Sequence, residues 1–239
     1  MDDDRWISEI RPKDRSIGAT ASDLPSLNRV LKQIENTKAK TMIDLGCGYG
    51  GLTTYVAKYL NIDNVYGVDL DDERLSYARS RCVKTYKLDL NRDRLPFPDG
   101  FFDLVVSFGA LEHLVYFDNF FSESFRVLTK DGHIIIAMPN LGSYVNRIAL
   151  LLGYQPRDVE ISFKFPPGIL PFHARGFVGH IHSATLGAVK QMLKHYGFNI
   201  TKVGSLSPYH SNKLVRAADK TFSLSPSLSR RFIILSKKP

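Results

Sequence analysis

The chain has 239 residues, of which 44% are hydrophobic and 23% are charged, a composition that argues against a disordered protein. Its two cysteines, Cys47 and Cys82, form no C-x-x-C pair, which argues against a disulfide framework and a structural zinc site. The acidic start MDDDRW is no secretory signal, and the apolar run IALLLGY is too short to span a bilayer, so a cytoplasmic location is expected. The net charge of +8 divides into −3 over residues 1–140 and +11 over residues 141–239, which points to a negatively charged partner or to a solvated basic face.

Apolar periodicity over the first 140 residues predicts short strands that alternate with helices. This alternation is typical of a parallel sheet that is covered by helices on both faces. The expected helices are 22–36, capped by Ser22 or Asp23, then 50–60, 71–80 and 119–128. The expected strands are 41–45, 64–70, 82–90, one within 101–111, and 133–139, the last after a turn at KDG.

The pattern changes after residue 140. A helix is expected within 141–154, an irregular segment over 155–182, a helix over 183–198 between a Ser183 cap and a Gly197 stop, and strands at 199–205 and 230–238. The fold class predicted is α/β, a Rossmann-like seven-stranded mostly parallel sheet with helices on both faces and an inserted lid. A single domain is expected, with an N-terminal helical cover (1–40), a cofactor-binding core (41–140), the lid (141–182) and a closing helix and strands (183–239).

The stretch IDLGCGYGG (43–51) fits two glycine patterns. Gly46, Gly48 and Gly51 fit the dinucleotide fingerprint G-x-G-x-x-G, and Gly46, Gly48 and Gly50 fit G-x-G-x-G. A pyrophosphate is favoured at a helix N-terminus by backbone N–H groups and the helix dipole. Asp44, two residues before the first glycine, would repel that anion and suits a cationic ligand group instead.

Four stretches in this order and spacing resemble the class I S-adenosylmethionine-dependent methyltransferases, in particular the broad type 11 small-molecule group. They are IDLGCGYG, VYGVDLDDERLSYAR, LDLNRDRLPFPDGFFDLVVSFGALEHL and VLTKDGHIIIAMPN, which cover about residues 41–140. GHIHSATLGAVKQMLKHYGFNI resembles the closing helix and strand of that family. The resemblance implies S-adenosylmethionine as cofactor, which carries an ammonium and a sulfonium and no phosphate.

The resemblance assigns the glycine loop to the methionine part of this cofactor. Gly46 and Gly48 would let the backbone approach it, with Cys47 between them, and Asp44 would orient its amino end. Phe108 and the backbone near it would flank the methionine.

The resemblance assigns the nucleoside part to the ends of the next two strands. Asp69 would accept hydrogen bonds from both ribose hydroxyls, although an acidic residue does the same for a nicotinamide cofactor. Leu70 would pack on the adenine, Asp89 would accept from the adenine amino group, and Leu90 would donate its backbone N–H to the ring. The alternative for each aspartate is a loop or cap residue.

Methyl transfer is an in-line displacement, so a base is needed only if the acceptor must lose a proton. Histidine suits that role, and His113, His180 and His182 are the candidate catalytic residues, with His173 in the same insertion. Their alternative is local packing or a bond to backbone. A metal site built on the H-x-H of residues 180–182 is not expected, because no Cys or carboxylate pair accompanies it.

The stretch SFGALEHL stands where methyltransferases acting on base amines carry an Asn/Asp-Pro-Pro-aromatic motif, which disfavours base N-methylation.

Residues 141–182 are apolar and aromatic yet contain Arg147, Arg157, Lys164 and Arg175. This pattern fits a pocket for an amphipathic acceptor with an anionic group, or a packed subdomain with a basic surface.

The favoured function is therefore methyl transfer to oxygen or carbon of a small-molecule or lipid-like acceptor, with an anionic group on the acceptor and peripheral membrane contact as options. A methyltransferase acting on RNA or protein is the first alternative, although no nucleic-acid module is visible. An NAD-dependent oxidoreductase and a non-catalytic cofactor-binding protein are the others. The acceptor and the oligomeric state stay open.

Overall fold

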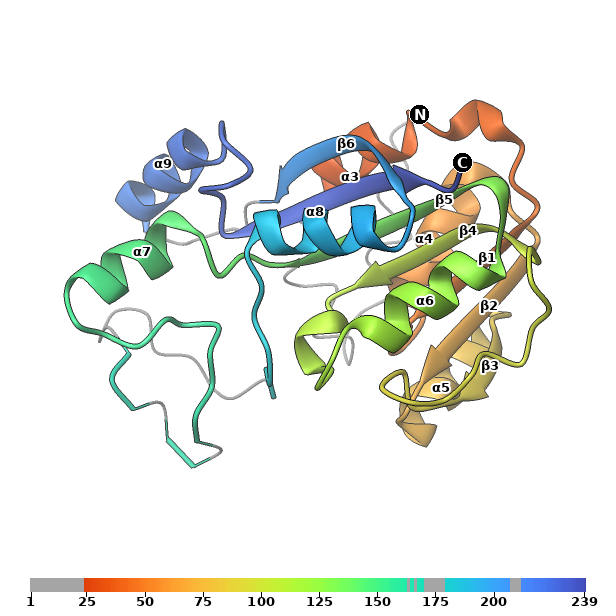
Figure 1. Cartoon of the computed structure of the whole chain (residues 1–239), viewed down its shortest axis with the longest axis horizontal. Helices are drawn as coiled ribbons and strands as arrows, with labels where there is room; N and C mark the ends of the chain where they lie inside the picture. The colour runs from red at the N-terminus through yellow and green to blue at the C-terminus, as the bar shows by residue number, and fades with distance from the viewer. Residues whose placement is uncertain (1–23, 163, 166, 170–178, 207–211) are drawn as a thin grey trace.

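The computed structural model describes residues 24–162, 164–165, 167–169, 179–206 and 212–239 (Figure 1). These residues form a seven-stranded sheet in the order β3-β2-β1-β4-β5-β7-β6, in which β7 is antiparallel to both neighbours and the other pairs are parallel. The predicted fold class is therefore confirmed. The strands are β1 (Thr41–Leu45), β2 (Asn64–Asp69), β3 (Lys84–Lys87), β4 (Phe102–Phe108), β5 (Leu128–Pro139), β6 (Asn199–Leu206) and β7 (Arg231–Lys237).

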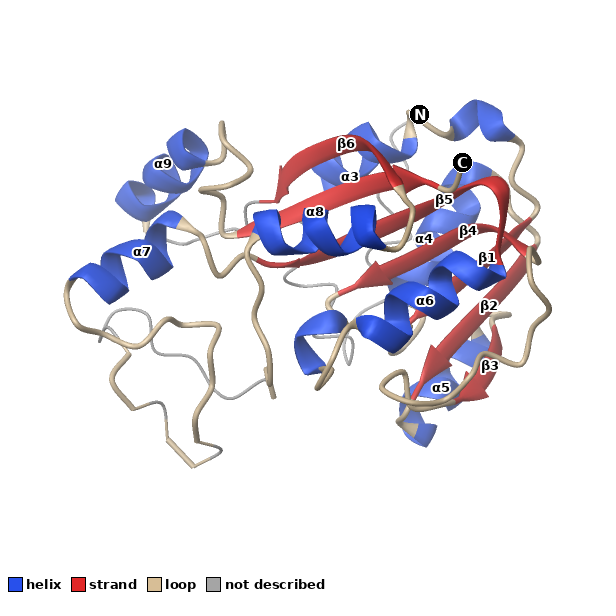
Figure 2. Cartoon of the chain, in the orientation of Figure 1, coloured by secondary structure: helices blue, strands red, loops and turns tan. Residues whose placement is uncertain are grey.

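Helices cover both faces of the sheet, as Figure 2 shows in blue against red. One buried cluster joins the sheet to α6 and α8, and a second joins the opposite face to α3, α4 and α5. Both clusters consist of apolar side chains that alternate along the strands and recur at helical spacing, so burial of two apolar faces holds the layers together. The helices are α3 (Leu24–Leu31), α4 (Gly51–Leu60), α5 (Asp72–Ser80), α6 (Asp118–Val127), α7 (Tyr144–Leu151), α8 (Leu186–His195) and α9 (Lys213–Phe222), with 3₁₀ turns η2 (Glu35–Thr37) and η3 (Leu111–His113).

Three details differ from the sequence expectation. The predicted cap Ser183 is wrong, because Thr185 caps α8 and accepts from the backbone N–H of Ala188. The strand expected from residue 133 is assigned from Leu128, but its pairing with β4 skips from Leu128 to His133 and Asp131 between them has a φ of 64°, so the chain bends at the KDG stretch. Helix α9 was not expected at all. The proposed caps Ser22 and Asp23 lie outside the described residues.

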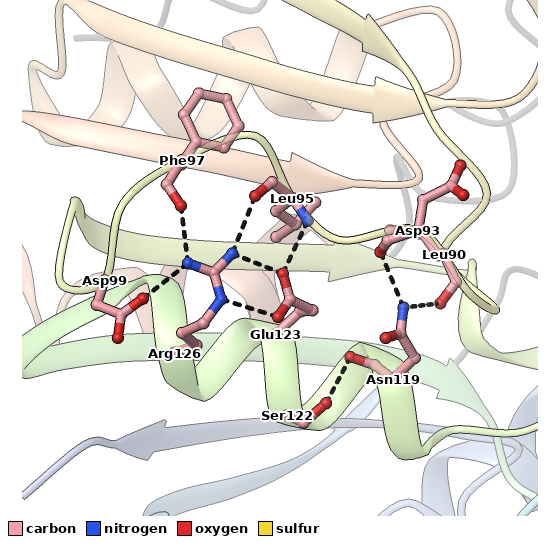
Figure 3. Close-up of polar contacts among 9 residues, drawn as sticks. All are labelled: Leu90, Asp93, Leu95, Phe97, Asp99, Asn119, Ser122, Glu123 and Arg126. Atoms are coloured by element: carbon pink, nitrogen blue, oxygen red, sulfur yellow. Dashed lines mark hydrogen bonds and ion pairs between the residues drawn. The ribbon is translucent and has the colours of Figure 1, made fainter.

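Side chains of helix α6 form hydrogen bonds and ion pairs with the loop that follows β3 (Figure 3). The guanidinium of Arg126 donates to the carbonyls of Leu95 and Phe97 and pairs with two carboxylates, those of Asp99 and Glu123. Two turns earlier, the Asn119 amide donates to the carbonyls of Leu90 and Asp93. Charge-assisted bonds of this kind hold a loop more firmly than neutral ones. The loop carries Leu90, so this network positions one wall of the candidate site.

Helices α7 and α9 pack together beyond the carboxyl ends of β4 and β5 (Figure 1). The rings of Tyr144 and Phe222 stack with centroids 4.3 Å apart, and the Tyr144 hydroxyl donates to buried Asp219, which also binds Arg230. The described helices include none that is both long and apolar enough to cross a membrane. The predicted lid thus begins with helix α7, which contacts Arg230, the residue just before strand β7, through Asp219.

Candidate active site

A cavity of about 460 Å³ lies at the carboxyl ends of the parallel strands. Four chain segments line it, because each of them follows one of the strands β1 to β4 at the same edge of the sheet. This is where ligands bind in open α/β sheets. The lining residues are Asp44, Gly46, Cys47, Gly48, Gly51, Leu52, Asp69, Leu70, Asp71, Arg74, Leu88, Leu90, Asn91, Phe108, Gly109, Ala110, His113 and Leu114.

The glycine loop has the conformation of the G-x-G-x-G pattern. Gly46, Gly48 and Gly50 have φ values of 87°, 51° and 76°, and Gly51 is the first residue of α4. A Cβ on Gly46 would lie 2.3 Å from the Cβ of Ala110, whereas a Cβ on Gly48 would meet nothing within 4 Å. Gly46 therefore lets the loop pack on the turn after β4, and Gly48 leaves open space for a ligand.

Asp44 is a buried acid with one unsatisfied oxygen. Its side chain receives a hydrogen bond from the Thr53 hydroxyl at 2.6 Å on Oδ2, while Oδ1 is buried without a partner. Burial raises the pKa of Asp44 to about 7; the Thr53 bond opposes the shift and the charge of Asp69 adds to it. A cationic group in the cavity would satisfy Oδ1 and stabilise the carboxylate, which suits the ligand inferred from the sequence.

Asp69 shapes the loop as well as the cavity. Its carboxylate accepts from the backbone N–H of Gly48 at 2.9 Å and from that of Asp71 at 3.1 Å. Each carboxylate oxygen can accept more than one hydrogen bond, so ribose hydroxyls could bind in addition. The predicted ribose ligand therefore lies at the cavity and is held in a fixed orientation.

The other predicted cofactor residues differ in position. Leu70, Leu90 and Phe108 line the cavity, and Leu70 is 56% exposed, so it offers an apolar surface on which a ring could pack. Asp89 is not among the lining residues, and its Oδ1 accepts from the backbone and side chain of Asn91. Asn91, which sequence reasoning missed, lines the cavity at that place.

Cys47 lines the cavity and has a buried thiol. The thiol is free and 8% exposed, and burial together with the charges of Asp44 and Asp69 raises its pKa above the usual range. A thiol held in its protonated form is a poor nucleophile. The raised pKa therefore disfavours Cys47 as a nucleophile, and its side chain packs in this loop.

The three histidines expected near the acceptor take different places. His113 lines the cavity, and its Nδ1 is bonded to the Gly179 carbonyl at 2.8 Å. His180 is 8% exposed, and burial lowers its pKa to about 4, with the His113 charge acting in the same direction. His182 is exposed and outside the cavity lining, with its ring 6.4 Å from that of Tyr116. His173 lies outside the described residues.

Glu112 is a buried acid that sequence reasoning missed. It is 3% exposed, its pKa is raised by burial, and its Oε2 has no hydrogen-bond partner. Its Oε1 lies 3.9 Å from Nε2 of His180. The stretch LEHL shows only an acid next to a histidine, and the burial of Glu112 depends on the return of residues 179–182 onto this turn.

The strand order, the antiparallel seventh strand and a glycine loop beside two aspartates are those of the class I S-adenosylmethionine-dependent methyltransferase fold. Residues 43–136 match the methyltransferase domain family, so this part of the chain forms a class I S-adenosylmethionine-dependent methyltransferase domain. S-adenosylmethionine is the cofactor of this family. The family assignment favours the methyltransferase interpretation over the nicotinamide-dependent alternative.

Individual relatives agree with this assignment. The chain is 33% identical over 161 residues to a "Probable S-adenosylmethionine-dependent methyltransferase" of Mycolicibacterium smegmatis, covering 67% of this chain and 52% of that protein. It is 27% identical over 143 residues to a "Fatty-acid O-methyltransferase" of the same organism, covering 56% and 52%. The chain thus spans about half the length of these curated relatives. The crystal structure of a SAM-dependent methyltransferase from Archaeoglobus fulgidus has the same fold, with a TM-score of 0.62, 19% identity and coverage of 99% and 100%.

We expect the Asp69→Asn variant to bind S-adenosylhomocysteine about tenfold more weakly than the wild type, measured by titration calorimetry. The amide keeps the size of the side chain but loses the charge-assisted bonds to hydroxyl donors, which are worth about 1.5–3 kcal/mol. Asp103→Asn is the matched control, since Asp103 accepts from Lys40, Thr41 and no cavity residue. Equal affinity in wild type and Asp69→Asn would show that Asp69 is not the ribose ligand.

Proposed function

We propose that this protein transfers the methyl group of S-adenosylmethionine to an oxygen of an amphipathic, lipid-like acceptor that carries an anionic group. The observation that carries the proposal is a set of exposed apolar side chains on α7 and the turn after it, here called the α7 apolar surface. Ile148, Leu150, Leu151, Leu152 and Tyr154 form this surface, and Leu151 is 85% exposed. An exposed apolar set of this size favours contact with an apolar ligand or a membrane.

The insertion that begins with α7 also returns to the cavity. The backbone N–H groups of Ile181 and His182 donate to the Glu112 carbonyl at 2.8 and 3.1 Å, and Gly179 contacts His113 at the cavity lining. An acceptor tail bound along the insertion would therefore have its head group near the cavity. This connection supports the insertion as the acceptor-binding part of the chain.

The positive charge of residues 141–239 supports an acceptor with an anionic head group. Residues 141–239 contain 14 Lys and Arg against 3 Asp and Glu, and Arg147 stands on α7 itself with an exposed side chain. Arg157 is different, because it is half-buried and burial lowers its pKa. Arg175 lies outside the described residues. A basic surface raises the local concentration of anionic ligands, and this effect weakens with salt. The similarity to a fatty-acid O-methyltransferase is consistent with such an acceptor.

The residues around the cavity would have separate roles in binding the cofactor and in orienting the acceptor. When bound, the cofactor supplies a methyl group already activated on a sulfonium. Asp44, whose Oδ1 has no partner, would hold a cationic group, and Asp69 would accept from hydroxyl groups in addition to Gly48. A carboxylate oxygen on the acceptor would need no base, because it has no proton to lose. The side chains around the cavity would then orient the acceptor and exclude water.

The test is a methyl-transfer assay with saturated and unsaturated fatty acids, followed by mass spectrometry of the product. We expect ester formation, and we expect the double variant Leu150→Ser, Leu151→Ser to raise KM about fivefold or more, because two side chains lose apolar contact. Binding of S-adenosylhomocysteine should be unchanged in this variant. Leu224→Ser, which alters another exposed leucine outside the α7 apolar surface, is the matched control.

The same samples distinguish the alternatives. Saturable RNA binding in a filter assay, without any methylated lipid, would overturn the proposal in favour of an RNA acceptor. Flotation with acidic-lipid vesicles at low salt that is lost at high salt would support an anionic acceptor presented by a membrane. Methylation of fatty acids with equal KM in wild type and the double variant would contradict the role of the α7 apolar surface.

A further inference from the structure

We infer that Glu112, His113 and His180 form a binding site for one divalent first-row transition-metal ion at the rim of the cavity. The three side chains come from the turn η3 after β4 and from residue 180 on the segment that returns from the insertion. One ligand atom from each lies within 4.8 Å of the other two. Residues 67 positions apart in the sequence are thus brought together by the docking of that segment.

The spacing of the atoms suits an ion between them. His180 Nε2 and Glu112 Oε1 are 3.9 Å apart, which is too far for a hydrogen bond. A tetrahedral ion with bonds of about 2.1 Å holds its ligand atoms about 3.4 Å apart. A small rotation of the side chains would close the remaining gap. His113, the exposed member, has the most freedom to adjust.

Buried polar atoms in this cluster lack partners. Oε2 of Glu112 and Nδ1 of His180 are both buried without a hydrogen bond, and the Glu112 side chain is 4% exposed. A buried carboxylate oxygen without a donor or a cation is costly. A cation beside Glu112 would offset the cost of burying its carboxylate, and rotation of the carboxyl group could bring Oε2 to the ion in place of Oε1. His180 would bind the ion through Nε2, which leaves its Nδ1 unpartnered.

Hydrogen bonds from neighbouring groups fix the position of His113 and of the segment that carries His180, as is usual for metal ligands. Nδ1 of His113 is bonded to the Gly179 carbonyl, which requires a proton on Nδ1 and leaves the lone pair on Nε2. Glu160 accepts from the backbone N–H groups of Gly179 and His180 and so fixes that segment. A second ring nitrogen bonded to a carbonyl is the usual support of a ligating histidine.

The donor set indicates the class of ion. Two imidazole nitrogens and one carboxylate oxygen suit Zn²⁺, Mn²⁺, Fe²⁺ or Co²⁺, whereas Ca²⁺ and Mg²⁺ prefer oxygen alone. The expectation that no metal site exists considered an H-x-H pair, but exposed His182 is not part of this cluster. Glu112 supplies the carboxylate that the histidine pattern lacked.

The site also bears on the acceptor, and this step rests on the proposed function. Asp44, Asp69 and Asp71 line the cavity, so their charges would repel an anionic head group. A divalent ion at the rim, beside His113, would attract that group and would have an open position for one of its oxygens. The ion would thus position the acceptor, while the methyl donor occupies the glycine-loop side.

The experiment measures metal binding directly on the full chain after treatment with a chelator. Zn²⁺ is titrated by calorimetry, and Co²⁺ is followed through its visible absorption. We expect one ion per chain, with affinity reduced at least tenfold by Glu112→Gln and by His180→Gln. His195→Gln, which changes an exposed histidine on α8, is the matched control and should bind as the wild type does.

Binding of S-adenosylhomocysteine is measured in the same samples, so a failed methyltransferase assignment would appear separately from a failed metal site. No saturable binding of Zn²⁺ or Co²⁺, or equal affinity in wild type, Glu112→Gln and His180→Gln, would overturn the inference. If the buried variants fail to fold, His113→Ala changes the exposed ligand and must show the same tenfold loss.

Discussion

Substitution of Gly46 by Ala is expected to destabilise the protein by about 2–5 kcal/mol and to abolish cofactor binding. The new methyl group would lie 2.3 Å from the Cβ of Ala110, and the backbone of residue 46 has a φ of 87°. Overpacking costs about 1–3 kcal/mol and left-handed backbone on a non-glycine residue about 1–2 kcal/mol. Urea unfolding gives the first effect and titration with S-adenosylhomocysteine the second.

Two further variants separate these causes. In the double variant Gly46→Ala, Ala110→Gly, the clash is removed and only the backbone strain remains, so we expect about 1–2 kcal/mol of destabilisation. Gly48→Ala adds a methyl group that meets nothing within 4 Å. Its φ of 51° still strains the backbone of an alanine, so we expect about 1–2 kcal/mol of destabilisation and weaker cofactor binding, because the new Cβ enters the open space. If the double variant is as unstable as Gly46→Ala, contact with Ala110 is not the cause.

Cofactor affinity is expected to fall about fiftyfold between pH 7 and pH 5 because of Asp44. The pKa of this acid in the free protein is raised to about 7, so most molecules carry it protonated at pH 5. A cationic ligand group stabilises the carboxylate, and below the raised pKa its binding must displace a proton. Binding is therefore strongest above pH 7 and weakens as the pH falls, and calorimetry in two buffers of different ionisation enthalpy would show proton release.

The Asp44→Asn variant is the control for this pH effect. It should bind weakly with little change between pH 5 and 7, although Asp69 and His113 remain in the same cavity. Thr53→Val removes the hydrogen bond that lowers the pKa of Asp44, so the transition should move to higher pH. The raised pKa also predicts that the free energy of unfolding of the free protein decreases as the pH rises from about 4 to 7, because the folded state binds this proton more tightly. A pH dependence that is the same in wild type and Asp44→Asn would contradict the assignment.

The sequence predicted the sheet well because its signals are local. Buried runs such as TMIDL form β1, and Asp71 caps α5 by accepting from two backbone N–H groups of its first turn. The loop at Gly46 and Gly48 could also be predicted, because the spacing of its glycines in the sequence matches the positions that have a positive φ. An error arose where a side chain that could cap a helix bonds instead to a residue far away in the sequence. Ser183 bonds to the Asp158 carbonyl, so Thr185 takes the cap of α8.

The rim of the site could not be predicted in this way. Glu112 is buried because residues 179–182 return to its backbone across 67 or more positions, and no local pattern records that contact. Asp89 fits the sequence motif and its role stays a prediction, whereas Asn91, which accompanies it at the cavity and donates to its Oδ1, carries no such signal in the sequence. Long-range packing decides which polar groups face a cavity, and such packing is weakly encoded in residue spacing.

The position of β7 also determines when the fold can form during synthesis. This strand, Arg231–Lys237, lies between β5 and β6 and pairs with seven residues on each neighbour. Until the ribosome has released residue 237, β5 has an unpaired edge and β6 has no place in the sheet, so the nascent chain exposes apolar strands to the cell. A chaperone that covers this edge would protect the chain, and a truncation that removes β7 should leave an aggregating product rather than a smaller folded domain.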